Sequence, residues 1–366
     1  MLQKEKITRN QFAILVMMFT VGSSILILPS GLAAEAKQDA WIAALLAIAV
    51  GVALVFLYMV LGNRYSTMTL PEYSEIILGK WLGKIVSILY FAFFFLLSAL
   101  VLRNIGDFLN TYQLPHTPIA VTHFVFLLVV IMSIRLGLET FSRSAEFFFP
   151  WVIALILVLL FAIVPQIEFK NIQPIMGEGI KPIIRASIPF VGSPILELVV
   201  FLMIIPAINR KQGGKMGFLT GYLIGGTVLF LISIITILVL GTELTSRETY
   251  PSYTLAKQIN IGNFIQRVEA IASFIWFITI FIKMSLSFYA SAFCLAHILK
   301  LKDYRVVIFP LAIIMLVLSL VAYPNTAYFL TFISATWPFL ALVYGLIIPL
   351  LLFLISSFTK KRVPKA

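Results

Sequence analysis

Ionisable residues stand at three places deep inside the long apolar runs of this 366-residue sequence. Glu197 follows a Gly-Ser-Pro triplet, Lys283 lies in the middle of FITIFIKMSLSFYAS, and Arg103 precedes Asp107 by four residues. An unpaired charge is costly at such depth, so each of these side chains is expected to bind a partner or a ligand. This pattern is typical of binding and coupling chemistry rather than of catalysis.

Glu197 and the Arg103–Asp107 pair each leave two roles open. Glu197 either receives a ligand ammonium or a proton, or only stabilises the positive start of the helical segment around it. Arg103 and Asp107 share one face of a helix at their spacing, so they can form a structural ion pair. The same pair can also act as a gate or contact a ligand carboxylate near the end of its helix.

Two apolar runs are interrupted at their centres by small residues and prolines. The interruptions comprise Gly22, Ser23 and Ser24 in the first run, and Phe190, Gly192, Ser193 and Pro194 in a later one. An unwound turn leaves backbone groups unpaired at a cost of several kcal/mol, unless a cavity, an ion or a ligand satisfies them. The amides that begin each following segment favour an anion such as a carboxylate. We therefore predict a ligand site here, although small residues also serve close helix packing.

Ten apolar runs are long enough to cross a membrane as helices. Of the residues, 61% are hydrophobic and only 11% are charged, which excludes an ordinary soluble domain. The runs lack the period-two alternation of a membrane barrel, so an all-α polytopic membrane protein is expected. The runs span residues 11–36, 40–62, 83–110, 117–135, 144–164, 182–208, 215–240, 264–298, 304–323 and 333–357.

The two interrupted helices are the first and the sixth, which divides the ten into two groups of five. Because five is odd, the second group must insert upside-down relative to the first. We therefore expect one integral membrane domain over residues 1–366, with inverted halves at about 8–165 and 180–358. Paired interruptions in inverted halves indicate a central site of the transporter type.

The net charge of +12 is a signal of topology rather than of nucleic-acid binding. If the chain starts in the cytoplasm, most of its 27 Lys and Arg residues fall in cytoplasmic segments, as the positive-inside rule requires. Both termini are therefore predicted to be cytoplasmic. No phosphate loop, metal cluster or nucleophile–base spacing is recognisable, so the sequence predicts no enzyme, no metal site and no cofactor.

Four stretches together form a specific pattern that spans essentially the whole chain. They are ITRNQFAILVMMFTVGSSILILPSGLAAEAKQDAWIA, RNIGDFLNTYQLPHTPI, NIQPIMGEGIKPI and PILELVVFLMIIP. In these stretches the chain resembles the B subunits of GerA-type spore germinant receptors, the spore-permease branch of the amino acid–polyamine–organocation transporter superfamily. One departure is Leu196, where many relatives have Gly before the Glu.

The resemblance implies a LeuT-like inverted-repeat fold in the spore inner membrane. It also implies a complex with an A-type subunit and a lipoprotein C-type subunit, and an amino acid or similar nutrient bound between the first, third, sixth and eighth helices. Sodium-coupled members of this fold class hold a sodium ion between the eighth helix and the first. Lys283 is therefore expected either to replace that ion, with Ser287 on the same face, or to pair with Glu197 or another carboxylate as a static strut.

Three functions are compatible with these features. The first is a receptor subunit that binds a nutrient and signals germination to its partners. The second is an amino acid–proton symporter, and the third is an ion or water channel. A receptor and a symporter both need one central site and two conformations, so sequence physics does not separate them. The resemblance favours the receptor.

Overall fold

The computed structural model describes residues 5–209, 214–259 and 268–358. Within these ranges the chain folds almost entirely into helices, and a single bridge of extended backbone joins Ile7 to Ile208. This architecture follows from the apolar composition, because a helix satisfies all of its own backbone groups in hydrocarbon.

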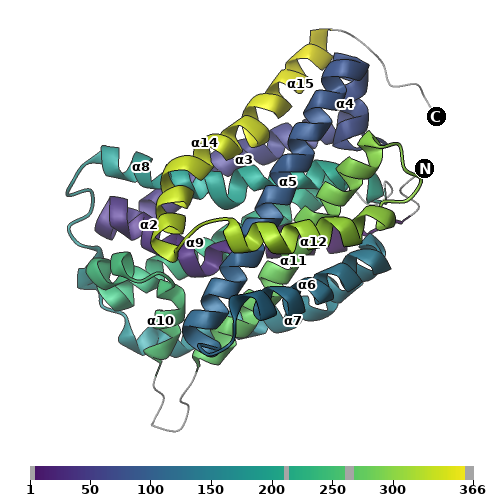
Figure 1. Cartoon of the computed structure of the whole chain (residues 1–366). Helices are drawn as coiled ribbons and strands as arrows, with labels where there is room; N and C mark the ends of the chain where they lie inside the picture. Colours follow the sequence, from purple (N-terminus) through teal and green to yellow (C-terminus); the bar gives the residue numbers. More distant parts are fainter. Residues whose placement is uncertain (1–4, 210–213, 260–267, 359–366) are drawn as a thin grey trace.

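The elements fall into two series along the chain. The first series is α1 (Arg9–Val21), α2 (Ser24–Ala36), α3 (Ala40–Arg64), α4 (Leu70–Leu78), α5 (Lys80–Phe108), α6 (Ile119–Leu136) and α7 (Leu138–Ile163). The second series is α8 (Ile180–Phe190), the π turn η5 (Val191–Ile195), the 3-10 helix η6 (Leu196–Met203), α9 (Gly214–Arg247), α10 (Pro251–Lys257), α11 (Glu269–Ile298), α12 (Arg305–Val321), α13 (Thr326–Thr331), the π turn η9 (Phe332–Thr336), α14 (Trp337–Leu342), the π turn η10 (Val343–Ile347) and α15 (Ile348–Phe358). In Figure 1, α2 lies beside α8, and α4 lies beside the end of α15.

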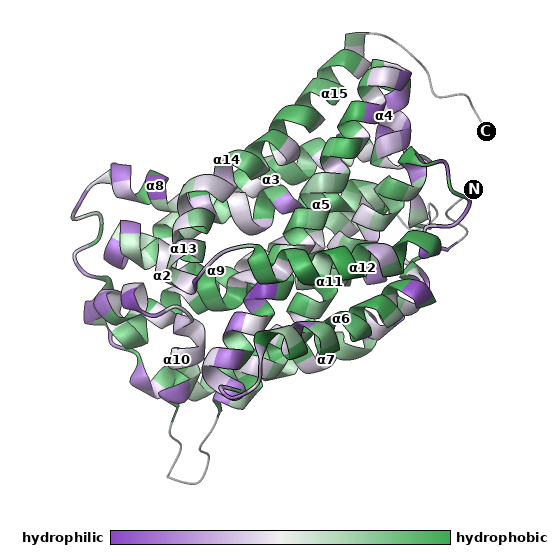
Figure 2. Ribbon diagram, viewed as in Figure 1, coloured by the Kyte–Doolittle hydropathy of each residue, from purple (hydrophilic) through white to green (hydrophobic). Residues whose placement is uncertain are grey.

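Eight helical stretches in the described residues are long and apolar enough to cross a membrane. One of them, Ser24–Arg64, joins α2 to α3 through a short 3-10 turn, and α1 and α12 are shorter apolar helices. The long helices are hydrophobic over most of their length, whereas hydrophilic residues gather around α10 and the start of α8 (Figure 2). The fold class is as expected, while the count of ten crossing helices stays a prediction. The last helical stretch, Thr326–Phe358, starts earlier than the expected residue 333.

The first apolar run is broken where the sequence predicts it. α1 ends at Val21, Gly22 adopts a φ of 21° and a ψ of −123°, and α2 begins at Ser24. A Cβ at position 22 would lie 2.6 Å from Cδ of Lys283, so both the conformation and the space require glycine.

The second break lies between α8 and η6. Ser193 leaves the helical region at a φ of −141° and a ψ of 113°, and the Ser193–Pro194 peptide bond is cis. The chain then continues as the 3-10 helix η6. A 3-10 helix of this length is uncommon, because its hydrogen-bond geometry is poorer than that of an α-helix.

A glycine stripe brings α9 into contact with α1. Gly217, Gly221 and Gly225 recur every four residues and therefore share one face of α9. A Cβ at Gly221 would lie 2.2 Å from the carbonyl oxygen of Ala13, so the two backbones touch. Close approach through small residues is the usual way in which membrane helices gain packing energy.

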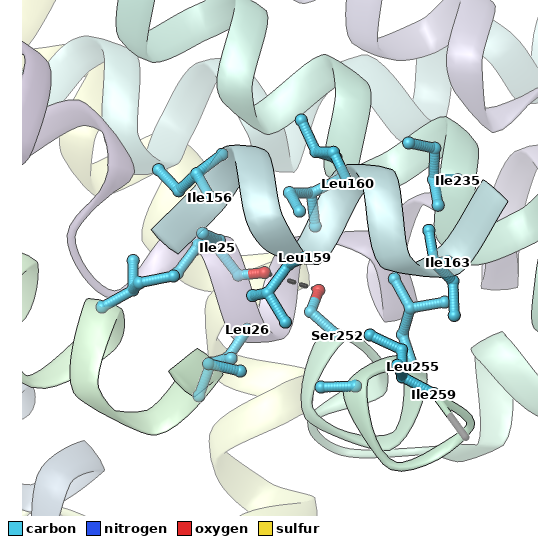
Figure 3. Close-up of a pocket in the computed structure, with 14 residues that line it drawn as sticks. Ile25, Leu26, Ile156, Leu159, Leu160, Ile163, Ile235, Ser252, Leu255 and Ile259 are labelled. Atoms are coloured by element: carbon cyan, nitrogen blue, oxygen red, sulfur yellow. Dashed lines mark hydrogen bonds between the residues drawn. The ribbon is translucent and has the colours of Figure 1, made fainter. Parts of the chain in front are cut away.

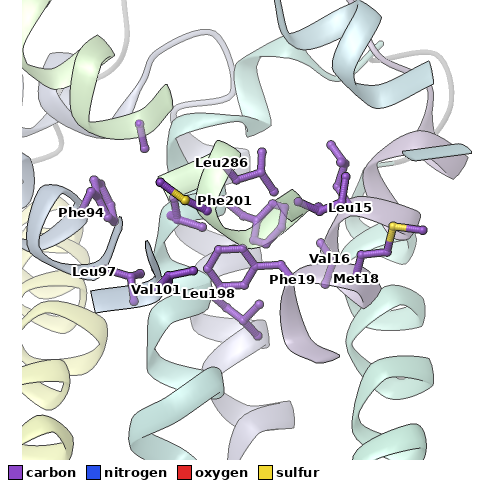
Figure 4. Close-up of a cluster of buried hydrophobic side chains, with 14 of the residues drawn as sticks. Leu15, Val16, Met18, Phe19, Phe94, Leu97, Val101, Leu198, Phe201 and Leu286 are labelled. Carbon is purple, nitrogen blue, oxygen red and sulfur yellow. The ribbon is translucent and has the colours of Figure 1, made fainter. Parts of the chain in front are cut away.

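Aromatic rings fill the space between α1 and η6. Phe12 and Phe19 both make edge-to-face contacts with Phe201, with ring centroids 5.4 Å apart in each pair. Figure 4 shows side chains of α1, α5, η6 and α11 meeting in this buried apolar cluster. Edge-to-face aromatic pairs add attraction beyond the burial of their area.

The segment before α1 closes the same side of the molecule. Ile7 donates its backbone N–H to the carbonyl of Ala207 and accepts from the N–H of Asn209, both at 3.0 Å. Glu5 accepts from the backbone N–H of Leu138 and so caps the first turn of α7. The segment before α1 is therefore tied both to the chain just after η6 and to the start of α7.

On the other side, α10 supports α2 through one hydrogen bond. Pro29 has no N–H, so the carbonyl of Ile25, one turn earlier, has no helical donor. The hydroxyl of Ser252 donates to this carbonyl at 2.7 Å, within an apolar crevice between α2, α7, α9 and α10 (Figure 3). The short helix starting at Pro251 thus satisfies a backbone group that the proline leaves free.

Candidate functional site

A buried ion pair joins the two helix breaks. Nζ of Lys283 on α11 lies 2.6 Å from Oε2 of Glu197 on η6, and the side chains are 0% and 2% exposed. The same ammonium donates to the hydroxyl of Ser23 at 2.9 Å, and it lies 5.4 Å from the ring centroid of Phe19. Because the stem of Lys283 crosses Gly22, one side chain contacts the first break and neutralises a charge at the second.

The second oxygen of the carboxylate has a partner on α14. The indole Nε1 of Trp337 donates to Oε1 of Glu197 at 2.8 Å. A continuous polar chain therefore runs from Trp337 through Glu197 and Lys283 to Ser23, and it connects four helices at the centre of the apolar core. Hydrogen bonds in which one partner is charged are about twice as strong as neutral ones, so this chain is a strong link between the helices.

A small inner pocket adjoins this polar chain. It holds about 20 Å³, which is room for about one water molecule. The polar part of its lining is Ser23, Asn104, Ser193, Glu197 and Trp337, and the apolar part is Leu97, Leu100, Val101, Phe329, Phe332 and Ile333. The expected fourth wall was the eighth helix, but the structure places α13, η9 and α14 there, with Lys283 of α11 behind the carboxylate.

A larger cavity of about 490 Å³ reaches the breaks between α2 and α8. Its exposed rim includes Glu35 and Arg185, and its buried floor includes Ser23, Ser24 and Ser193. Ser23 and Ser193 also line the inner pocket, so the two spaces meet at the breaks. The hydroxyl of Ser24 is buried and has no hydrogen-bond partner among the described residues, which leaves it available to a ligand.

The remaining predicted ligand residues shape the breaks and offer no polar side chain. Phe190 lines the large cavity, whereas Gly192 faces α14, where a Cβ would lie 2.7 Å from Cα of Pro338. Pro194 is buried inside the π turn η5. Gly22 lies under the stem of Lys283 and contributes its carbonyl.

Thr279, rather than Ser287, faces the first break. Its hydroxyl lies 3.4 Å from the carbonyl oxygen of Gly22, one turn before Lys283 on α11. The same hydroxyl also lies 3.0 Å from the carbonyl oxygen of Ile275 in its own helix. Ser287, one turn after Lys283, donates to the carbonyl of Lys283 at 2.9 Å. Helical spacing places both hydroxyls on the face of Lys283, so the sequence signal did not distinguish them.

Arg103 and Asp107 form an ion pair away from the inner pocket. Nε of Arg103 lies 2.9 Å from Oδ1 of Asp107, and Nη1 donates to the carbonyl of Leu320 at 2.8 Å. The hydroxyl of Tyr323 donates to the other carboxylate oxygen of Asp107 at 2.6 Å. Neither charged side chain lines the pocket or the cavity, and the pair fastens α5 to the end of α12.

Sequence reasoning missed Trp337 and Asn104. Trp337 directly precedes Pro338 in an otherwise apolar run, and Asn104 follows Arg103, so each had a weak local signal. Oδ1 of Asn104 lies 3.5 Å from the hydroxyl of Tyr250, which belongs to the segment before α10. Burial raises the pKa of the Tyr250 phenol above its usual value, so it remains a neutral donor toward this site.

The family follows from a family model that matches most of the chain. The family model described as spore germination protein matches residues 6–327. This chain belongs to the spore germination protein family. Spore germination protein KB of Bacillus subtilis (strain 168) is 30% identical, over 100% of this chain and 98% of its own length. Spore germination protein YndE of the same organism is 26% identical, over 97% of this chain and 98% of its own length.

Solved structures show the fold of this spore germination protein. MhsT in complex with L-phenylalanine has a TM-score of 0.70 at 13% identity, with 97% of this chain and 99% of MhsT covered. Mhp1, a nucleobase-cation-symport-1 family transporter in a closed conformation with bromovinylhydantoin bound, has a TM-score of 0.66 at 12% identity. That match covers 94% of this chain and 79% of Mhp1. The chain is therefore an integral membrane protein with a LeuT-like fold and broken first and sixth helices.

Proposed function

We propose that this spore germination protein is a receptor subunit that binds a small nutrient at the two helix breaks and signals germination. The nutrient is an amino acid or a similar small molecule, and the signal passes to A-type and lipoprotein C-type subunits in the spore inner membrane. The observation that carries the proposal is the Glu197–Lys283 pair, which links both breaks directly behind Ser23 and Ser193, two residues of the cavity floor. With cytoplasmic termini, that cavity opens away from the cytoplasm.

The charges of the site favour a ligand without net charge. Glu197 and Lys283 neutralise each other, and no other charged side chain lines the inner pocket among the described residues. A ligand with an extra charge would remain uncompensated in this dry place, at a cost of several kcal/mol. A zwitterion avoids that cost, because the amides at the start of α2 favour its carboxylate and the freed carbonyls near Gly22 favour its ammonium.

Lys283 takes the place of a bound cation in this proposal. Its ammonium contacts Ser23, its stem covers Gly22, and Thr279 stands beside the Gly22 carbonyl. A resident positive charge at the first break makes ligand binding independent of sodium. The alternative, a static strut, requires only the contact with Glu197.

An amino acid–proton symporter is the second candidate. It is favoured by the asymmetry of the molecule, in which a cavity reaches the breaks from the α2 side while the α1 side is packed. One open side and one closed side are what alternating access requires of a transporter.

Binding and uptake measured on the same preparation separate the two candidates. The purified chain in proteoliposomes is screened against neutral, cationic and anionic amino acids, with and without partner subunits. A receptor predicts that a net-neutral amino acid raises the melting temperature without accumulating in the vesicles. Accumulation driven by a proton gradient would establish the symporter. If no member of the panel stabilises the chain in either preparation, the proposed nutrient site is contradicted.

A further inference from the structure

Each oxygen of the Glu197 carboxylate has its own partner, from a different helix. Oε1 accepts from the indole Nε1 of Trp337 at 2.8 Å, and Oε2 lies 2.6 Å from Nζ of Lys283. Trp337 is only 2% exposed and lines the inner pocket. The orientation of the carboxylate therefore depends on two donors that belong to α14 and α11.

Packing fixes the Trp337 indole in place. The ring stacks on Phe93 of α5 with centroids 5.5 Å apart and an interplanar angle of 14°. The next residue, Pro338, sits so close to Gly192 that a Cβ on this glycine would lie 2.7 Å from the Cα of the proline. Trp337 also follows directly on the π turn η9, and π turns inside helices are often found at functional sites.

We propose that Trp337 is a positioning residue of the ligand site. Its N–H holds one carboxylate oxygen, so that the other stays on Lys283 and the ammonium stays at the first break. Without this donor, Oε1 would lose its protein partner, and the carboxylate would turn toward the cavity and loosen its contact with Lys283. The inference rests on the proposed function, because it states what keeps that site electrically balanced.

The test reads the electrostatic potential of the site and needs no ligand. Ser193→Cys is introduced into a Cys294→Ala chain in nanodiscs and treated with a cationic and an anionic methanethiosulfonate of similar size. The ratio of the two modification rates reports the local potential. Trp337→Phe keeps an aromatic ring but removes the N–H. We expect it to raise the cationic-to-anionic ratio about threefold to tenfold, as the freed carboxylate turns toward the cavity.

Two controls make the result specific. Trp276→Phe removes an equally buried indole whose Nε1 has no hydrogen-bond partner in the described part of the chain, and it should leave the ratio unchanged. In a Glu197→Gln/Lys283→Met background there is no carboxylate to orient, so Trp337→Phe should have no effect. Trp337→Phe could leave the ratio unchanged in the Cys294→Ala/Ser193→Cys chain, or raise it equally in the Glu197→Gln/Lys283→Met background. Either result would show that the indole only packs.

A second measurement covers the case in which Trp337→Phe is not recovered. The chain has five Trp residues, whose indole N–H resonances are observed after 15N labelling. Glu197→Gln should shift one of these resonances. The same resonance should still be present in the spectrum of Trp276→Phe, so it does not come from Trp276. If none moves, the inference fails. Because neither experiment uses a nutrient, their outcomes are independent of the amino acid screen that tests the proposed function.

Discussion

The two halves of the broken first helix have opposite surroundings. α1 touches the glycine stripe of α9, packs its rings on η6, and is preceded by a segment that pairs with residues 207–209, after the end of η6. α2 borders a cavity of about 490 Å³ and is supported by α10 through the Ser252 hydroxyl. One side of the break is therefore tightly packed, whereas the other borders open space, and this is the side on which our proposal places the ligand.

The difference has a visible origin in residue size. α1 carries large apolar residues such as Phe12 and Phe19, which fill the space toward η6, while glycines on α9 let the backbones approach. α2 has Ser30 and Gly31 on its cavity side, and these leave space open. Lys283 lies between the two regions and contacts the break that separates them.

Of the substitutions considered, removal of Lys283 should lower the stability of the fold most. Lys283→Met leaves the Glu197 carboxylate buried and unpaired, and loss of one partner of a buried pair typically destabilises by about 3–5 kcal/mol. Arg103→Met should be milder, because Asp107 is 10% exposed and keeps the Tyr323 hydroxyl. Thermal unfolding in nanodiscs checks the order of the two variants.

Lys283→Met/Glu197→Gln provides the control for that prediction. The double variant should recover part of the lost stability, since no uncompensated charge remains. If Arg103→Met proves as damaging as Lys283→Met, the ion pair at the breaks is not the central polar contact of the fold.

Matched glycine substitutions sharpen the contrast between the two sides. Gly221→Ala would place a Cβ 2.2 Å from the Ala13 carbonyl oxygen and force α9 away from α1, so we expect a loss of about 1–3 kcal/mol. Gly31→Ala meets no atom within 4 Å on α2 and should be neutral, or stabilising by up to about 1 kcal/mol. The test is to compare the melting temperatures of the two variants. Similar shifts would contradict the difference in packing between the α1 side and the α2 side of the break.

Sodium dependence tests what Lys283 does at the break. Lys283→Ala should leave a cation-sized gap beside Gly22 and Thr279, and ligand binding in this variant should become sodium-dependent by about tenfold or more. The wild-type chain should bind equally well with sodium or choline. Binding that is intact and indifferent to sodium in both proteins would identify Lys283 as a static strut.

The smallest effect is expected where α10 supports α2. Ser252→Ala leaves the Ile25 carbonyl without its donor and should destabilise by about 1 kcal/mol. Ser246→Ala removes a hydroxyl that bonds only near its own helix end and is the control. Equal melting temperatures for both variants would show that another group takes over the carbonyl.

The breaks were predictable because their signals are local. Gly22 and Ser193, with the serines and prolines near them, are poor choices for the centre of a membrane helix in any fold. A contact of Lys283 with Glu197 or another carboxylate was one of two alternatives for this lysine, since few ionisable side chains lie at that depth, and the structure pairs it with Glu197. The roles of these residues in ligand binding stay predictions.

Other features depend on tertiary packing and were not predictable. The register of α11 against α1 decides between Thr279 and Ser287, and both spacings are equal in the sequence. Trp337 is one aromatic residue among many apolar ones, and only the fold brings its N–H to Glu197. The pairing of Ile7 with Ile208 joins segments far apart in the chain.

Cysteine accessibility at the breaks tests the central claim most directly. In a Cys294→Ala chain, Ser193→Cys lies on the cavity floor, while Leu198→Cys lies on η6 in the packed cluster, and both positions are buried. A membrane-impermeant thiol reagent should modify residue 193 from one side only, a nutrient that stabilises the chain should slow that reaction, and residue 198 should not react. Equal rates at 193 with and without such a nutrient, or similar rates at 193 and 198, would contradict a ligand site at the breaks.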